Sequence, residues 1–146
     1  MNVFVSGSMS KKELPPIATQ KLDNIISKNI TVLVGGANGV DSLIQRYLMN
    51  KNYANVCVYF VGAKPRNNIG NWQSKNIKSG NEQGRAFFTL KDAAMANEAD
   101  YGLMVWDGKS KGTKNNVELM KQKNKKFYLI LNGELLKRSN PSQEDL

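Results

Sequence analysis

Three short loops carry the residue types that can hold a phosphate. They read "SGSMS" (residues 6–10), "GGANGVD" (35–41) and "DGKSKGT" (107–113). Small Gly, Ser and Thr residues let backbone N–H groups close around an anion, and a helix that follows adds the positive end of its dipole. The chain also has 21 Lys and Arg against 12 Asp and Glu, a formal net charge of +9, which favours an anionic partner. Together these residues predict a nucleotide-binding site.

Each feature also has a purely structural interpretation. "GGANGVD" is either a tight turn in which Asp41 caps a helix, or a cradle in which its three glycines surround a phosphate or ribose and Asp41 bonds a sugar hydroxyl. "DGKSKGT" is either a Lys-rich surface turn or a phosphate site made by Gly112 and Thr113 just before a helix. It has neither the P-loop spacing nor the G-x-G-x-x-G dinucleotide fingerprint. The positive charge, in turn, is either a solvated surface or a track for a polyanion.

Larger side chains extend the candidate site. Trp72 and Trp106 can stack on a base, although Trp106 ends a buried strand and a core role is the alternative. Arg66 can bind a phosphate with its fork of donors, or lie solvated on the surface. Asp92 can point at the ligand, but Thr89 to Asp92 also has the spacing of a helix cap. The candidate ligand-binding residues are Ser6, Gly7, Ser8, Gly35, Gly36, Asn38, Gly39, Asp41, Arg66, Asn67, Trp72, Asp92, Trp106, Gly108, Lys111, Gly112, Thr113 and Asn116.

The composition excludes several kinds of chemistry. The chain has no His and a single Cys, Cys57, so a zinc site and a Ser–His or Cys–His nucleophile pair are excluded. We expect no metal and no cofactor. No apolar run reaches about 18 residues, and the first ten residues read as a strand rather than as a signal peptide. We therefore expect a cytoplasmic protein that does not span a membrane.

Alternating strands and helices must position these loops. Near-continuous apolar runs predict parallel strands at Val3–Ser6, Thr31–Val34, Val56–Val61, Tyr101–Trp106 and Phe127–Leu131. Helical patterns lie between them at Ile17–Lys28, Asp41–Asn50, Leu90–Ala99 and Asn115–Gln122. This order predicts an α/β fold: one Rossmann-like, doubly wound, mostly parallel sheet with helices on both faces. In such a sheet, ligands bind beyond the carboxyl ends of the strands.

Two segments depart from that order. Residues 62–88 show no apolar period, and an irregular segment of this length is typical of a lid or a subunit interface. Residues 133–146 read as a polar tail after a single domain at residues 1–132.

The segments "VFVSGS", "VLVGGANGVD" and "KDAAMANEADYGLMVWDGKSKGTKNN" carry a resemblance to a known family. With the order of elements around them, they resemble the SLOG superfamily of Rossmann-like proteins over about residues 1–131. That superfamily includes cytokinin-activating phosphoribohydrolases, DNA-processing recombination mediators and sensor domains for ADP-ribose-type signals. The nucleoside 2-deoxyribosyltransferases are similar in architecture. The resemblance implies a nucleotide bound by the loops after the second and fourth strands.

The resemblance also bears on catalysis. The phosphoribohydrolases carry P-G-G-x-G-T-x-x-E, whose glutamate acts at the anomeric carbon of the ribose. Counted from Gly112 and Thr113, that place is Asn116, which cannot act as a nucleophile. Glu118 lies two residues on, about 200° around the helix, and is expected to face away.

We therefore hypothesise a protein that senses or sequesters a small nucleotide-derived ligand, such as an ADP-ribose-like or cyclic nucleotide signal, without cleaving it. We expect a homodimer or higher homo-oligomer, and a virus-encoded sponge for an immune signal fits this description. The alternative is a nucleotide N-glycoside hydrolase that uses Asp92, Asp107 or Glu118 as its carboxylate. Binding of single-stranded nucleic acid ranks third.

Overall fold

A seven-stranded sheet forms the centre of the protein. The computed structural model describes residues 1–78, 80 and 85–138. Its elements are β1 (Asn2–Gly7), α1 (Pro16–Ser27), β2 (Thr31–Val34), α2 (Val40–Asn50), β3 (Val56–Phe60), β4 (Gln73–Asn76), α3 (Arg85–Glu98), β5 (Tyr101–Trp106), α4 (Lys111–Gln122), β6 (Lys126–Leu131) and β7 (Glu134–Arg138). The strand order is β4-β3-β2-β1-β5-β6-β7, and every pair is parallel except β6 with β7. The predicted α/β fold is confirmed.

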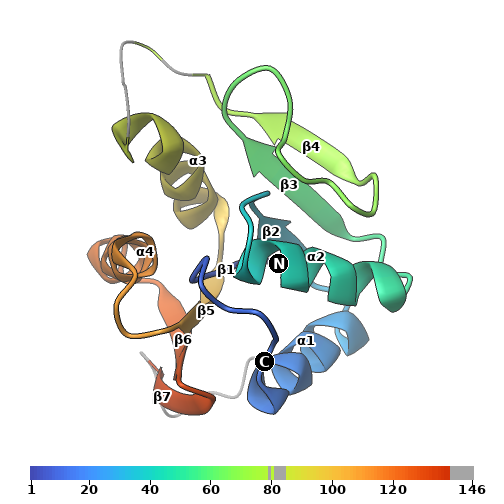
Figure 1. Cartoon of the computed structure of the whole chain (residues 1–146), viewed down its shortest axis with the longest axis vertical. Helices are drawn as coiled ribbons and strands as arrows, with labels where there is room; N and C mark the ends of the chain where they lie inside the picture. The colour runs from blue at the N-terminus through green and yellow to red at the C-terminus, as the bar shows by residue number, and fades with distance from the viewer. Residues whose placement is uncertain (79, 81–84, 139–146) are drawn as a thin grey trace.

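The helices cover both faces of the sheet. Figure 1 shows α1 and α2 on one side and α3 and α4 on the other. Successive residues of β1 point to opposite faces: Val3 and Val5 pack with Leu22 of α1 and Ile44 of α2, whereas Phe4 packs in the cluster on the other face. Because each central strand is buried on both faces, its sequence is continuously apolar, which is why these strands were predictable.

Two strands were not predicted. β4 has four polar, exposed residues and lies at the edge of the sheet, so it has no apolar pattern to detect. β7 begins at Glu134, inside the segment expected to be a polar tail, and pairs antiparallel with β6 through the turn at Asn132 and Gly133. Both Asn132 and Gly133 have a positive φ, the backbone conformation that such a tight turn requires. The expectations for residues 79, 81–84 and 139–146 fall outside the described residues.

Two helices begin earlier than predicted. α3 starts at Arg85 rather than Leu90, and α4 starts at Lys111 rather than Asn115. The expected helix cap at Thr89 and Asp92 is therefore wrong, because both residues lie well inside α3. Gly112 and Thr113 do not precede α4 but lie in its first turn. Within the described part of the chain, no helix has the length and apolar character needed to cross a membrane.

The strand order reverses between β1 and β5. After β1 the chain winds outward through β2, β3 and β4, and it then returns to the other side of β1 to form β5, β6 and β7. The loops that leave β1 and β5 therefore diverge toward opposite faces and leave a crevice between them. At Gly7, the end of β1 lies close against β5 and the start of α2. A Cβ added to Gly7 would lie 2.7 Å from Val40 Cγ1 and would also meet the Val105 carbonyl.

Replacement of Gly7 tests this close approach. We expect Gly7→Ala to lower the free energy of unfolding by about 1–3 kcal/mol or more, because the new methyl group meets backbone that cannot move cheaply. Urea denaturation measures the change. Gly112→Ala is the matched control, since its Cβ would meet only Ser110 Oγ at 4.0 Å and should shift stability by less than about 1 kcal/mol. Equal stability of the Gly7 variant and wild type would contradict this packing.

Candidate functional site

A cavity of about 710 Å³ opens at the point where the strand order reverses. Its size is in the range of small-molecule sites. Residues that follow β1, β2 and β3 meet there with side chains of α3 and the first turns of α4. Ten of the predicted residues line it: Ser6, Gly7, Gly36, Asp41, Arg66, Asp92, Lys111, Gly112, Thr113 and Asn116.

The amino-terminal end of α4 forms one wall of the cavity. Lys111, Gly112 and Thr113 occupy its first turn, where helix geometry leaves N–H groups without partners inside the helix. Ser110 is the N-cap, and its Oγ accepts a hydrogen bond from the Thr113 N–H at 3.4 Å. The N–H groups of Lys111 and Gly112 and the positive end of the helix dipole suit an anion here.

Asp107 shapes this loop rather than facing the cavity. Its Oδ1 accepts hydrogen bonds from the N–H groups of Lys109 and Ser110, each at 2.8 Å, and its Oδ2 accepts one from Ser10 Oγ at 2.6 Å. The bond from Ser10, followed by those from the two N–H groups, holds the pKa of Asp107 well below its usual value of 3.8. Asp107 therefore fixes the turn that begins α4, and it is absent from the cavity wall.

Three further predicted residues support the same loop. Ser8 is buried, and its Oγ accepts a hydrogen bond from the Asp107 N–H at 3.0 Å. The Trp106 indole donates to the Ser110 carbonyl at 2.9 Å and packs against the core, which agrees with its structural alternative. Gly108 has a φ of 83°, a conformation that favours glycine. None of the three lines the cavity.

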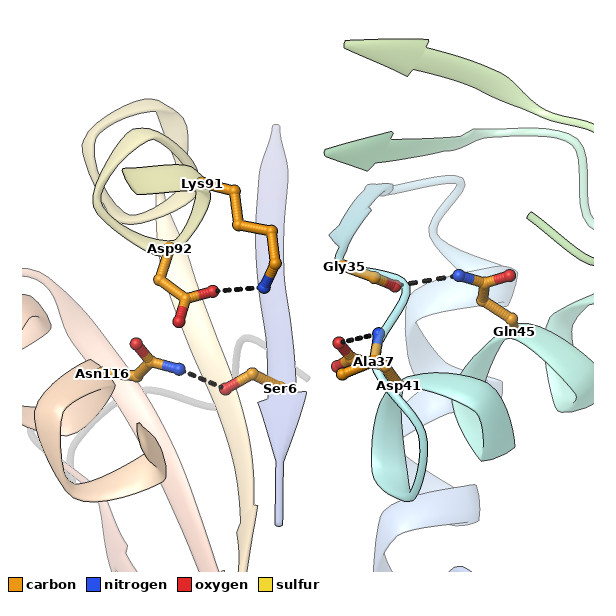
Figure 2. Close-up of polar contacts among 8 residues, drawn as sticks. All are labelled: Ser6, Gly35, Ala37, Asp41, Gln45, Lys91, Asp92 and Asn116. Carbon is orange, nitrogen blue, oxygen red and sulfur yellow. Dashed lines mark hydrogen bonds and ion pairs between the residues drawn. The ribbon is translucent and has the colours of Figure 1, made fainter. Parts of the chain in front are cut away.

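Asp41 lies in the opposite wall. It does not cap α2, because the N-cap is Gly39 and no side chain bonds there; instead Asp41 Oδ2 accepts a hydrogen bond from the Ala37 N–H at 3.1 Å (Figure 2). Burial raises the pKa of Asp41 to about 6, the positive charge of Lys91 lowers it, and the negative charge of Asp92 raises it further. A buried carboxylate is thus held at the edge of the cavity.

Lys91 and Asp92 form an ion pair inside the cavity. Lys91 Nζ lies 3.1 Å from Asp92 Oδ1, and the two side chains are only 17% and 14% exposed. Burial lowers the pKa of Lys91, but the charges of Asp92 and Asp41 outweigh it, so the pKa lies above 10.5 and the amine stays charged. Figure 2 shows both side chains pointing from α3 toward β1. Lys91 was not predicted as a site residue.

Asn116 occupies the position of the catalytic glutamate in the phosphoribohydrolase pattern. Its Nδ2 donates to Ser6 Oγ at 3.1 Å, and its side chain is buried in the cavity wall (Figure 2). Its Oδ1 is buried and has no hydrogen-bond partner in the described chain. Glu118 faces away as predicted: it is exposed and lies 3.6 Å from Lys121 Nζ.

Gln45 fastens the segment after β3 to the loop after β2. Its buried Nε2 donates to the Gly35 carbonyl at 2.8 Å and to the Asn67 carbonyl at 3.0 Å, while its Oε1 accepts from the Ile69 N–H at 2.9 Å. Asn67 Nδ2 donates to the Gly36 carbonyl at 2.7 Å. Asn67 and Gly35 therefore hold this part of the site together.

The segment after β3, which Gln45 fastens to the loop after β2, supplies cations to the rim of the cavity. Arg66 and Lys64 are exposed and line the rim. Gly39 and Asn38 do not line it; Gly39 has a φ of 81° and packs so closely on Met9 that a Cβ would overlap the Met9 backbone. Asn38 lies beside Asn67, with 3.4 Å between Oδ1 and Nδ2.

Trp72 lies away from the cavity. Its indole donates to the Tyr53 carbonyl at 2.8 Å, and its ring packs against the core at the amino-terminal end of β3. Asn68 bonds the Trp72 N–H and carbonyl, and Gly70 leaves room for the ring. The structure therefore gives Trp72 a packing role and does not bring it to the ligand-binding residues.

The wall formed by the end of β3 is more apolar. Tyr59, Phe60 and Val61 line it. The Tyr59 hydroxyl donates to the Glu98 carboxylate, which also pairs with Lys75, so the ring is fixed in place. The sequence analysis placed Tyr59, Phe60 and Val61 in the predicted strand Val56–Val61 but not in the site. The cavity therefore combines a polar, helix-terminal wall with an apolar one.

Lys91, which was missed, carried a weak signal. Lys91 lies four residues before the buried Met95, as the predicted Asp92 lies four residues before the buried Ala96. A helix that follows a strand begins at the carboxyl edge of the sheet, so charged residues early on its buried stripe face the crevice.

Comparisons with known proteins bear on the fold. No protein-family model matches the chain, and no curated protein matches its sequence. Among solved structures, the protein is similar to DNA processing protein A from Helicobacter pylori, a structure described for its single-stranded DNA binding mode. The TM-score is 0.65 at 16% identity, and the match covers 97% of this chain and 69% of that chain. This likeness supports the Rossmann-like fold and, at this identity, the fold alone.

The buried carboxyl of Asp41 predicts a pH dependence of stability. Because its pKa rises from 3.8 to about 6 on folding, the folded protein binds this proton more tightly than the unfolded chain. The contribution of Asp41 to stability is therefore greatest below about pH 4, and about 3 kcal/mol of it is lost as the pH rises to 6 and above. Asp41→Asn cannot ionise and keeps an acceptor for the Ala37 N–H. We expect it to unfold at higher urea than wild type at about pH 8, and at similar urea near pH 4. Lower stability of the variant at pH 8 would show that attraction to Lys91 outweighs burial.

Proposed function

We propose that the protein binds a small, phosphate-bearing, nucleotide-derived ligand in the cavity beside β1 and does not cleave it. The observation that carries this proposal is the convergence on one cavity of the α4 amino terminus and four cationic side chains, those of Lys64, Arg66, Lys91 and Lys111. Two carboxylates, Asp41 and Asp92, face the same cavity, so its formal side-chain charge is four minus two, or +2. A net positive, partly buried site favours an anion of limited charge.

The two walls suit the two ends of a nucleotide. Phosphate oxygens accept hydrogen bonds and would bind at the N–H groups of Lys111 and Gly112. Tyr59, Phe60 and Val61 offer apolar surface to a base or other planar group. A cavity of about 710 Å³ has room for a nucleotide-sized molecule.

The absence of a carboxylate at Asn116 supports binding rather than cleavage. Glycosidic hydrolysis needs a carboxylate at the anomeric carbon, and an amide cannot take that part. Of the carboxylates proposed for the enzyme alternative, Asp107 and Glu118 lie outside the cavity wall, and Asp92 is engaged with Lys91. A regulatory or sequestering role, including that of a sponge for an ADP-ribose-like or cyclic nucleotide signal, follows from tight binding without turnover.

Single-stranded nucleic acid is the second candidate. The fold similarity to DNA processing protein A and the net charge of +9 favour it. The buried Asp41 and Asp92 disfavour it inside the cavity, because carboxylates repel a phosphodiester chain. If this candidate is correct, oligonucleotide affinity falls steeply with salt and does not depend on cavity residues.

Mass spectrometry of co-purified small molecules tests the proposal directly. We expect heat to release an intact nucleotide-derived compound from protein expressed in cells that make the signal, in about stoichiometric amount. Added nucleoside monophosphates should remain intact, because Asn116 stands where the phosphoribohydrolase pattern has its glutamate and an amide cannot act at the anomeric carbon. Release of free base would establish the hydrolase instead. Light scattering of the same sample measures whether the expected homo-oligomer forms.

Two variants separate binding from packing. Arg66→Ala removes an exposed cation from the cavity rim, so we expect about 10-fold to 100-fold weaker ligand binding and an unchanged melting temperature. Trp72→Ala removes a ring that packs against the core, so we expect a loss of about 3 kcal/mol in stability and unchanged binding below the melting transition. Calorimetry measures the stability of each variant and its affinity for the co-purified compound. Weaker ligand binding by a fully folded Trp72→Ala variant would show that Trp72 belongs to the binding site.

A further inference from the structure

We infer that the cavity selects a ribose with its free 2′-hydroxyl over a 2-deoxyribose. This inference rests on the proposed function and names the sugar that the same site accepts. Three residues that line the cavity carry it, Asn116, Asp92 and Asp41, each of which has a side-chain oxygen able to accept a hydrogen bond. Asp92 and Asp41 lie on α3 and α2, and Asn116 lies about one turn beyond Lys111 and Gly112 on α4, so these acceptors are available for a part of the ligand other than its phosphate.

Asn116 gives the strongest observation. Its side chain is 4% exposed, and its amide is oriented by the hydrogen bond from Nδ2 to Ser6 Oγ at 3.1 Å. Oδ1 is left buried without a donor in the described chain. A buried acceptor without a partner costs about 1–3 kcal/mol, so such groups are rare unless a ligand satisfies them. Asn116 is therefore poised to accept a hydrogen bond from a donor on the ligand.

Asp92 and Asp41 extend the acceptor surface. Asp92 uses Oδ1 to pair with Lys91, and Asp41 uses Oδ2 to accept from the Ala37 N–H, so each keeps a second oxygen for the cavity. Figure 2 shows Asp92 and Asn116 pointing from neighbouring helices toward the same space beside Ser6. Gly35 leaves room for the side chains of Asp41 and Lys91, because a Cβ there would lie 2.8 Å from Asp41 Oδ2 and 3.0 Å from Lys91 Nζ.

These acceptors require a ligand that donates. A phosphate dianion has no donor and is repelled by carboxylates, so it does not satisfy them. Ribose hydroxyls are hydrogen-bond donors on a compact, neutral ring, so they can satisfy such acceptors without bringing negative charge near Asp92 and Asp41. Removing one hydroxyl leaves a buried acceptor unpaired, which is the condition under which sites discriminate most strongly.

Paired probes test the sugar preference on the wild-type protein. The four ribonucleoside 5′-monophosphates and their 2′-deoxy counterparts are titrated while NMR shifts or calorimetry report binding. We expect every ribonucleotide that binds to do so about 10-fold to 100-fold more tightly than its deoxy partner. Equal affinity within a pair would overturn the inference and leave the proposed function intact. If none of the eight compounds binds, the inference fails, and the mass spectrometry of co-purified molecules decides the proposed function.

A variant then assigns the preference to Asn116. Asn116→Ala should reduce the ribose-to-deoxyribose ratio to within about threefold, mainly by weakening the ribonucleotide. Asn115→Ala, an exposed neighbour on the same helix, is the matched control and should keep the wild-type ratio. A full ratio in a folded Asn116→Ala variant would overturn the assignment. If that variant does not fold, the wild-type pairs still decide whether the preference exists.

Discussion

The parallel pairing of β1 with β5 is the constraint on which the rest of the site depends. It joins two halves of the sheet that wind in opposite directions, so the loops that leave the two strands must separate toward opposite faces. The cavity is the space between these loops. Gly7 makes the join possible, because any side chain there would collide with the Val105 carbonyl and with Val40.

Local hydrogen bonds then convert this crevice into a defined shape. On one side, Asp107 accepts hydrogen bonds from the backbone N–H groups of Lys109 and Ser110. These bonds fix the start of α4, whose first turn lines the cavity. On the other side, Gln45 ties the loop after β2 to residues 67–69. Both networks are polar and use backbone groups, and both hold the walls before any ligand arrives. Preorganisation of this kind lowers the ordering cost of binding.

The electrostatics of the cavity are mixed rather than uniformly positive. Lys91 sits between Asp92 and Asp41, which keep it charged despite its burial. The amine in turn limits the rise in the pKa of Asp41. This arrangement places acceptors in the interior and leaves the cations Lys64, Arg66 and Lys111 exposed. Under the proposed function, such a layout would favour a ligand with one anionic end over a long polyanion, a distinction that the net charge of the chain alone cannot make.

The sequence by itself determined five of the seven strands, because parallel strands buried on both faces must be continuously apolar, as in β1, β5 and β6. It also located three of the loops around the cavity and the outward orientation of Glu118, since these follow from strand ends and helical periodicity. Only the tertiary structure decided which loop residues line the cavity. Trp72, Trp106 and Asp107 have suitable chemistry, but packing and backbone hydrogen bonds use them elsewhere. Lys91 lines the cavity, and Gln45 joins two of the loops around it, because helices pack against strands distant in the chain. A local sequence pattern does not predict which side chains this packing brings to a cavity.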